Sequence, residues 1–283
     1  MKKLLALIAL SCTSALAQTK SGCPAELRFG LLPSDESSVN ARYEPLFKYI
    51  ESKTGSKVNH TIGADYAAVI VAMTAGKLDM AMFGPESFVQ AAKQTSVTPL
   101  VMIDNVNTGT GYYSSLWVRS DSPYKTLADL KGKSLAFVDP NSTSGYLMPM
   151  VYLLRDAKIK PDTYFSQVLF AGNHSSSLLS LTNKKVDVAA ISGTTVTNAI
   201  KAGQLKEGEL RAIWTSKKIP NSPIAISGRV PGQCRATLQK AFLSLKDPKI
   251  LAGFSAKRFV LATNADYAPV READRVKTQL MNK

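Results

Sequence analysis

The chain has 283 residues, 45% of them hydrophobic, and its 35 basic and 21 acidic side chains give a formal net charge of +14. This length allows one large domain or two smaller ones, and the charge favours anionic partners. The basic side chains are scattered, with no Arg-rich arm and no basic run interleaved with aromatic residues. We therefore expect no nucleic-acid partner.

The N-terminus has the pattern of a secretory signal peptide. Two lysines precede the apolar run Leu4–Leu10, and Ala15-Leu16-Ala17 forms a small-residue cleavage site. The run is too short to span a bilayer. We expect residues 1–17 to be removed and the mature protein to lie in the periplasm. Lipoprotein anchoring at Cys12 is a weaker alternative, because the apolar run before it would be very short.

Cys23 and Cys234 are the cysteines that remain after this cleavage. An even number of cysteines in an oxidising compartment predicts one disulfide, which would tie the N-terminal edge to a late segment. Two lone cysteines lack the spacing of a zinc site, and the whole chain has two histidines. We therefore expect no metal site and no cofactor.

Segments with the patterns of strands and helices alternate along the chain. Strands are predicted at Leu27–Leu32, Val58–Ile62, Leu78–Phe83 and Tyr113–Val118, and a helix at Ala67–Ala75. Alternation of this kind is typical of an α/β protein with largely parallel sheets.

A weak internal repeat suggests two lobes of similar design. A helix, a basic turn and a Leu/Val-Asp-apolar strand occur together twice, ending at Gly84 and at Gly193. Chance similarity between two helix–strand units is the alternative interpretation. In bilobal α/β proteins, ligands bind where strand ends and helix N-termini meet in the cleft.

Two polar segments mark the expected boundaries between these lobes. One lies near residues 118–122 and the other near residues 219–223, where Ile-Pro-Asn-Ser-Pro interrupts the pattern. If the chain crosses twice, residues 24–118 and 224–283 form the first lobe and residues 119–223 form the second.

The most informative segment is Asp139-Pro-Asn-Ser-Thr-Ser-Gly-Tyr146. It lies between the apolar strand Leu135–Val138 and a helical pattern, an arrangement that directs free backbone N–H groups and hydroxyls at an anion. The Gly-Lys-Ser/Thr ending of a nucleotide-binding loop is absent. The segment indicates anion binding without nucleotide chemistry, and an ordinary Ser-rich helix cap is the alternative.

Taken in order, these motifs resemble the periplasmic phosphate-, phosphite- and phosphonate-binding proteins of ABC importers, a branch of the type II bilobal solute-binding fold. The most specific part is Asn141-Ser-Thr-Ser-Gly145 with the downstream Gly172-Asn-His174. The other matching segments are Leu27–Ser34, Arg42–Leu46, Asp65–Ala68, Gly76–Pro85, Val186–Ala189 and Ile219–Ile224.

The resemblance implies a set of ligand-binding residues. The hydroxyls and amides of Ser142, Thr143 and Ser144 would hold a phosphorus oxyanion, and His174 would donate a further hydrogen bond. Two phenols from the first lobe, those of Tyr66 and Tyr112, would reach across the cleft. An oxyanion carries acceptors only, so its site requires convergent donors.

Two departures from the family pattern bear on the ligand. Members that bind aminoalkylphosphonates place acidic residues at positions that here are Thr194 and Ser222. A buried ammonium group without a carboxylate partner is costly. We therefore expect a ligand without an amine, such as phosphite, methylphosphonate, hypophosphite or phosphate.

The function that follows is solute binding for an inner-membrane ABC permease, by a monomer and without catalysis. An oxyanion-sensing protein that partners a membrane histidine kinase is the alternative. An exported hydrolase would need a nucleophile–base pair, a carboxylate pair or a metal cluster. The sequence contains no Gly-x-Ser-x-Gly motif and no His-rich motif.

Overall fold

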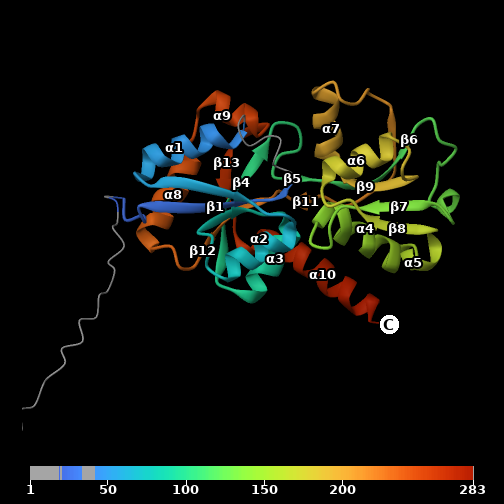
Figure 1. The fold of residues 1–283 in the computed structure, drawn as a ribbon, viewed down its shortest axis with the longest axis horizontal. Coiled ribbons are helices and arrows are strands. Elements are labelled where there is room, and N and C mark those ends of the chain that lie inside the picture. The colour runs from blue at the N-terminus through green and yellow to red at the C-terminus, as the bar shows by residue number, and fades with distance from the viewer. Residues whose placement is uncertain (1–18, 20, 34–41, 283) are drawn as a thin grey trace, which may run out of the picture.

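The computed structural model describes residue 19, residues 21–33 and residues 42–282. These residues form two α/β lobes that lie side by side (Figure 1). The predicted signal peptide, residues 1–17, and the alternative anchor at Cys12 lie outside the described residues. None of the described helices is long and apolar enough to cross a membrane.

The first lobe is built on a sheet with the strand order β13-β4-β12-β3-β1-β2. The strands are β1 (Glu26–Leu31), β2 (Lys57–Ile62), β3 (Met80–Met82), β4 (Val97–Asn105), β12 (Pro223–Ser227) and β13 (Ala256–Leu261). One face packs under α1 (Glu44–Thr54), α8 (Gly232–Ser244) and α9 (Pro248–Gly253). The other face packs against α2 (Tyr66–Thr74), α3 (Pro85–Gln94) and α10 (Ala268–Met281).

The second lobe is built on a sheet with the strand order β10-β6-β9-β7-β8. The strands are β6 (Ser114–Arg119), β7 (Ser134–Phe137), β8 (Gln167–Phe170), β9 (Val188–Ser192) and β10 (Leu210–Thr215). α6 (His174–Thr182) and α7 (Gly193–Lys201) share one hydrophobic cluster with this sheet. Four short helical segments follow β7 along the chain: η4 (Thr143–Leu147), α4 (Met148–Val151), η5 (Tyr152–Asp156) and α5 (Pro161–Tyr164). Their side chains contribute to a second hydrophobic cluster in this lobe.

Both sheets are mixed, with parallel pairs on one side and antiparallel pairs on the other, where the sequence predicted mostly parallel sheets. β1 pairs in parallel with β2 and β3, and β7 pairs in parallel with β8 and β9. β12 is antiparallel to both its neighbours, and so is β6. These two strands enter their sheets from the other lobe, so they run away from the cleft while β1, β3, β7 and β9 run towards it.

The lobes meet at a short antiparallel ribbon of β5 (Gly111–Tyr112) and β11 (Ile219–Pro220), which lies at the centre of Figure 1. β6 follows β5 and belongs to the second sheet. The boundary that the sequence predicted near residue 118 is therefore too late, and the crossing precedes Ser114. Strand periodicity locates a strand but contains no information on which sheet it joins.

The C-terminal helix α10 also connects the lobes. It packs against α3 of the first lobe and against α4, η4 and η5 of the second (Figure 1). The Tyr146 ring in η4 lies 5.5 Å from the Lys277 ammonium group on this helix. The helix therefore lies directly behind the segment that was predicted to bind an anion.

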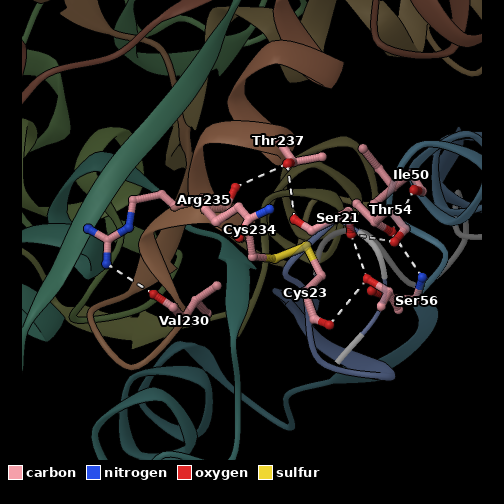
Figure 2. Close-up of a disulfide and its surroundings, with 11 residues drawn as sticks. Ser21, Cys23, Ile50, Thr54, Ser56, Val230, Cys234, Arg235 and Thr237 are labelled. Carbon is pink, nitrogen blue, oxygen red and sulfur yellow. Dashed lines mark hydrogen bonds between the residues drawn. A yellow bond between two sulfur atoms is a disulfide. The ribbon is translucent and has the colours of Figure 1, made fainter. Parts of the chain in front are cut away.

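A disulfide joins Cys23, just before β1, to Cys234 in α8 (Figure 2). The two residues are 211 positions apart in sequence, and both are fully buried. The neighbouring Ser21 hydroxyl donates to the Thr54 carbonyl at the end of α1. The N-terminal edge of the first lobe is thus tied to two helices on one face of its sheet.

Candidate ligand-binding site

A cavity of about 690 Å³ lies between the lobes. Seven of the eight residues that the sequence singled out for the ligand line it: Tyr66, Tyr112, Ser142, Thr143, His174, Thr194 and Ser222. The eighth, Ser144, is buried and is not part of the lining. The structure thus brings together residues that are up to 156 positions apart, the distance from Tyr66 to Ser222.

The segment Asp139–Tyr146, which the sequence predicted to bind an anion, is called the anion turn below. Its own backbone and the first lobe both hold it in place. Ser142 caps η4, and its Oγ accepts a hydrogen bond from the Gly145 amide at 3.1 Å. Thr143 Oγ1 accepts one from the Glu86 amide at the start of α3, at 2.8 Å. A hydroxyl has a single proton to donate, and both hydroxyls are acceptors here. The Ser142 proton therefore remains for a further acceptor, whereas the Thr143 hydroxyl is also in hydrogen-bonding contact with the Tyr112 phenol.

Gly145 is required by the close approach of this turn to its own strand. A Cβ atom at this position would lie 2.3 Å from Cβ of Val138, far inside van der Waals contact. The backbone of Gly145 also bonds to Val138, whose amide donates to the Gly145 carbonyl at 2.9 Å. The turn can fold back onto the end of β7 only with glycine here.

His174 is the first residue of α6 and contacts the turn through Ser144. The Ser192 amide donates to its Nδ1 at 3.3 Å, so the proton of the neutral ring must be on Nε2, which lies 3.4 Å from Ser144 Oγ. Burial lowers the pKa of His174 to about 4. The imidazole is therefore neutral above pH 5, and its Nε2–H faces the Ser144 hydroxyl.

Tyr112 lies opposite the turn on β5, where it pairs with Ile219 of β11. Its phenol takes part in hydrogen bonds with the hydroxyls of Ser144 and Thr143, and burial raises its pKa. The phenol therefore stays protonated at neutral pH and is available as a donor. Tyr112 thus places a hinge residue in direct contact with the anion turn.

A second contact between the lobes involves Asp139, immediately after β7. Its carboxylate accepts hydrogen bonds from the backbone of Asn141 and from the backbone of Tyr66, the first residue of α2. Burial raises the pKa of Asp139. A carboxylate at a helix N-terminus is favoured by the unpaired amides there. The turn thus contacts the N-termini of two helices in the first lobe, those of α2 and α3.

Comparison with known proteins shows which family this chain belongs to. The family described as "ABC transporter, phosphonate, periplasmic substrate-binding protein" matches residues 29–267. The chain belongs to this family. It is therefore the periplasmic phosphonate- or phosphate-binding component of an ABC importer, and the resemblance drawn from the sequence is confirmed. Proteins of this family are transport components and not enzymes.

Individual relatives agree with this assignment. The chain is 35% identical to the phosphate-import protein PhnD of Mycolicibacterium smegmatis over 78% of this chain and 73% of that protein. It is 32% identical to the phosphonates-binding periplasmic protein of Escherichia coli, over 78% and 68% of the two chains. These relatives favour the importer over the sensory alternative.

Solved structures confirm the bilobal fold. A binding protein of a phosphonate ABC transporter from Pseudomonas aeruginosa superposes with a TM-score of 0.84 at 25% identity, over 90% of this chain and 87% of that one. PhnD1 from Prochlorococcus marinus, solved in complex with methylphosphonate, gives 0.80 at 22% identity over 89% and 97%. The type II solute-binding fold predicted from the sequence is thus correct.

Many of the residues that line the cavity were not predicted, and Arg42, Asn105 and Asn221 are among them. Arg42 and Asn221 lie inside segments that carried the family resemblance, so their positions were visible although their roles were not. Asn105 lies in an Asn-x-Asn-Thr-Gly segment, which by itself indicates only a turn.

The lining of this cavity contains no carboxylate among the described residues, and Arg42 is its one formally charged side chain. The Arg42 guanidinium lies over the Phe254 ring at 4.5 Å. Within the described chain, no cluster of acidic, cysteine or histidine residues suited to a metal ion is found. The cavity is therefore neutral to basic and rich in hydroxyls and amides.

A buried cluster of ionisable groups lies behind the anion turn. Glu86 on α3 is fully buried, and its Oε1 accepts from Gln90 at 2.6 Å and lies 3.8 Å from the Lys277 ammonium. Asp274 on α10 forms ion pairs with Lys93 and Lys277. Burial and the nearby Asp274 raise the pKa of Glu86 to about 7. Glu86 Oε2 has no hydrogen-bond partner among the described residues. When Glu86 is protonated, this oxygen can donate a hydrogen bond to Asp274.

We expect Glu86→Gln to stabilise the protein at pH 8 and to change its stability little at pH 5. The folded pKa of about 7 exceeds the ordinary value of 4.5. Stability therefore increases as the pH falls from 7 towards 4.5, and the ionised carboxylate costs about 3 kcal/mol above pH 7. The glutamine side chain has nearly the same shape as the protonated Glu86 carboxyl group and cannot ionise. Urea unfolding at both pH values measures this difference.

Glu272→Gln is the matched control, because Glu272 is an exposed residue of α10 that pairs only with Arg275 among the described residues. Its effect should be below about 0.5 kcal/mol at either pH. Equal effects of Glu86→Gln at pH 5 and pH 8 would contradict the assignment of a raised pKa to Glu86.

Proposed function

We propose that this protein binds a small phosphorus oxyanion that carries no amine, such as phosphite, methylphosphonate or a similar phosphonate, and delivers it to an inner-membrane permease. The observation that carries the proposal is the lining of the cavity around the anion turn, which is rich in hydroxyls and amides. Hydroxyl donors converge there from both lobes, and no carboxylate lines the described cavity. Such a site offers donors to an oxyanion and no partner to an ammonium group.

In this proposal the anion turn is the principal ligand contact. Ser142 and Thr143 donate their hydroxyl protons to the oxyanion, and the phenols of Tyr66 and Tyr112 donate from the first lobe. His174 acts through the turn, since its Nε2–H orients the Ser144 hydroxyl. Charge-assisted hydrogen bonds of this kind are about twice as strong as neutral ones.

The same contacts explain how binding closes the lobes. The turn belongs to the second lobe, whereas the amide of Glu86 and the backbone of Tyr66 belong to the first. A ligand that engages the turn and both phenols adds contacts that exist only when the lobes are together, which shifts a hinged protein towards its closed state. The closed surface is then what the permease recognises.

Isothermal titration calorimetry with phosphite, methylphosphonate and 2-aminoethylphosphonate tests the ligand class. We expect the two ligands without an amine to bind at least ten-fold more tightly than 2-aminoethylphosphonate, because Thr194 and Ser222 offer its ammonium group no charge. Tighter binding of 2-aminoethylphosphonate than of both others would refute the proposal. Sulfate is a suitable negative control for general anion binding.

A further inference from the structure

Asn105, the last residue of β4, has a side chain whose orientation is settled by the backbone. Its Oδ1 accepts from the amides of Asn107 at 2.9 Å and of Thr108 at 3.2 Å. Backbone amides only donate, so the oxygen must face them and the Nδ2 group must point the other way. Nδ2 has no partner among the described residues, and Asn105 lines the cavity. Asn105 therefore presents a fixed donor.

Asn221, directly after β11, has the opposite orientation. Its Nδ2 donates to the carbonyls of Ile103 and Gly109, both at 2.8 Å. Carbonyl oxygens only accept, so the nitrogen must face them, and Oδ1 is the polar side-chain atom left without a partner in the described structure. Asn221 is 9% exposed and lines the same cavity. It therefore presents a fixed acceptor.

The two side chains are neighbours held by one turn. The Gly109 carbonyl accepts from the Asn105 amide and also from Asn221 Nδ2, at 2.8 Å each. The Asn221 amide donates to Thr110, two residues before Tyr112 on the hinge ribbon. A donor and an acceptor of fixed direction thus lie on the hinge side of the cavity, on chain segments adjoining the ribbon that carries Tyr112.

The cavity has room for more than an oxyanion. Its volume of about 690 Å³ is in the range of pockets that hold drug-sized ligands, whereas phosphite has only three oxygens around one phosphorus. A hydroxyl group both donates and accepts, so it can satisfy Asn105 and Asn221 together. A methyl group in its place would leave both amides unpaired, and an ammonium group accepts nothing from Asn105.

We propose that Asn105 and Asn221 form a second subsite, which binds an uncharged hydroxyl group on the carbon substituent of a phosphonate. This rests on the proposed function, because the oxyanion must occupy the anion turn for its substituent to reach the hinge side. The preferred ligands are then hydroxyalkylphosphonates, and bare oxyanions occupy only the first subsite.

Calorimetry on the unmodified protein tests the subsite with 2-hydroxyethylphosphonate and propylphosphonate, which differ by a hydroxyl in place of a methyl. We expect the hydroxyl compound to bind at least ten-fold more tightly. If both bind equally while methylphosphonate also binds, the subsite is refuted and the proposed function stands. If phosphite, methylphosphonate and both of these compounds fail to bind, the proposed function is refuted and the subsite with it.

Asn105→Asp tests the location. An aspartate oxygen still accepts from Asn107 and Thr108, so the turn is preserved, but a carboxylate replaces the donor. We expect the affinity for 2-aminoethylphosphonate relative to 2-hydroxyethylphosphonate to rise at least ten-fold. Asn183→Asp, at the exposed C-terminal end of α6, adds the same charge away from the cavity and should leave the ratio unchanged. An unchanged ratio in Asn105→Asp would refute the assignment.

Discussion

Replacing Ser142 and Thr143 together by alanine should weaken methylphosphonate binding by at least about 100-fold, since each lost hydrogen bond to a charged ligand is worth about 1.5–3 kcal/mol. Both hydroxyls accept from backbone amides in the structure, so their protons are directed elsewhere. Ligand raises the melting temperature in proportion to the logarithm of its concentration over Kd. We therefore expect the double variant to lose most of the ligand-induced rise.

The unliganded variant should itself melt at a lower temperature, because Ser142 caps η4 and Thr143 bonds to the start of α3. The informative quantity is thus the difference between liganded and unliganded melting temperatures. A Ser52→Ala/Thr74→Ala variant removes two helical hydroxyls that bond only to their own helices and do not line the cavity. It should keep the full rise. A full rise in the Ser142/Thr143 variant would exclude the turn as the oxyanion site.

Removing the disulfide with Cys23→Ser/Cys234→Ser should lower the free energy of unfolding by about 2–5 kcal/mol. The bond closes a loop between residues 211 positions apart and ties the segment before β1 to α8. Its loss frees the unfolded chain and leaves two hydroxyls in fully buried positions. Urea denaturation of the two proteins under oxidising conditions measures the change.

A reducing agent provides the internal control for this variant. Dithiothreitol should shift the unfolding midpoint of the unmodified protein towards that of the variant and should leave the variant itself unchanged. An unmodified protein whose midpoint equals that of the variant without reductant would show that the disulfide contributes nothing to stability.

Several elements of the fold were predictable because their signals are local. Asp65 caps α2 through its side chain, as its position before an apolar run indicated. The strand before the anion turn ends within one residue of its prediction, at Phe137. The turn itself was found from hydroxyls, a glycine and a flanking strand and helix, all within a dozen residues.

Other features depend on which distant segments meet, and sequence patterns do not encode them. The strand Ser114–Arg119 was located, but its partners β9 and β10 come from residues 70 to 100 positions later. The Asn221 amide is oriented by the carbonyls of Ile103 and Gly109, more than 100 positions earlier in the chain, so its role could not be read from the sequence.

The sequence by itself determined the family, the compartment that the family implies, the position of the anion turn and the absence of acids at Thr194 and Ser222. Only the tertiary structure decided that the sheets are mixed, that the crossing precedes Ser114, and that Ser144 lies behind the cavity. The physical reason is the sequence separation over which each signal acts. Helix caps, hydrophobic periodicity and turn residues act between near neighbours in the chain. Sheet partners and cavity walls are set by the packing of segments that the chain brings together only when it folds.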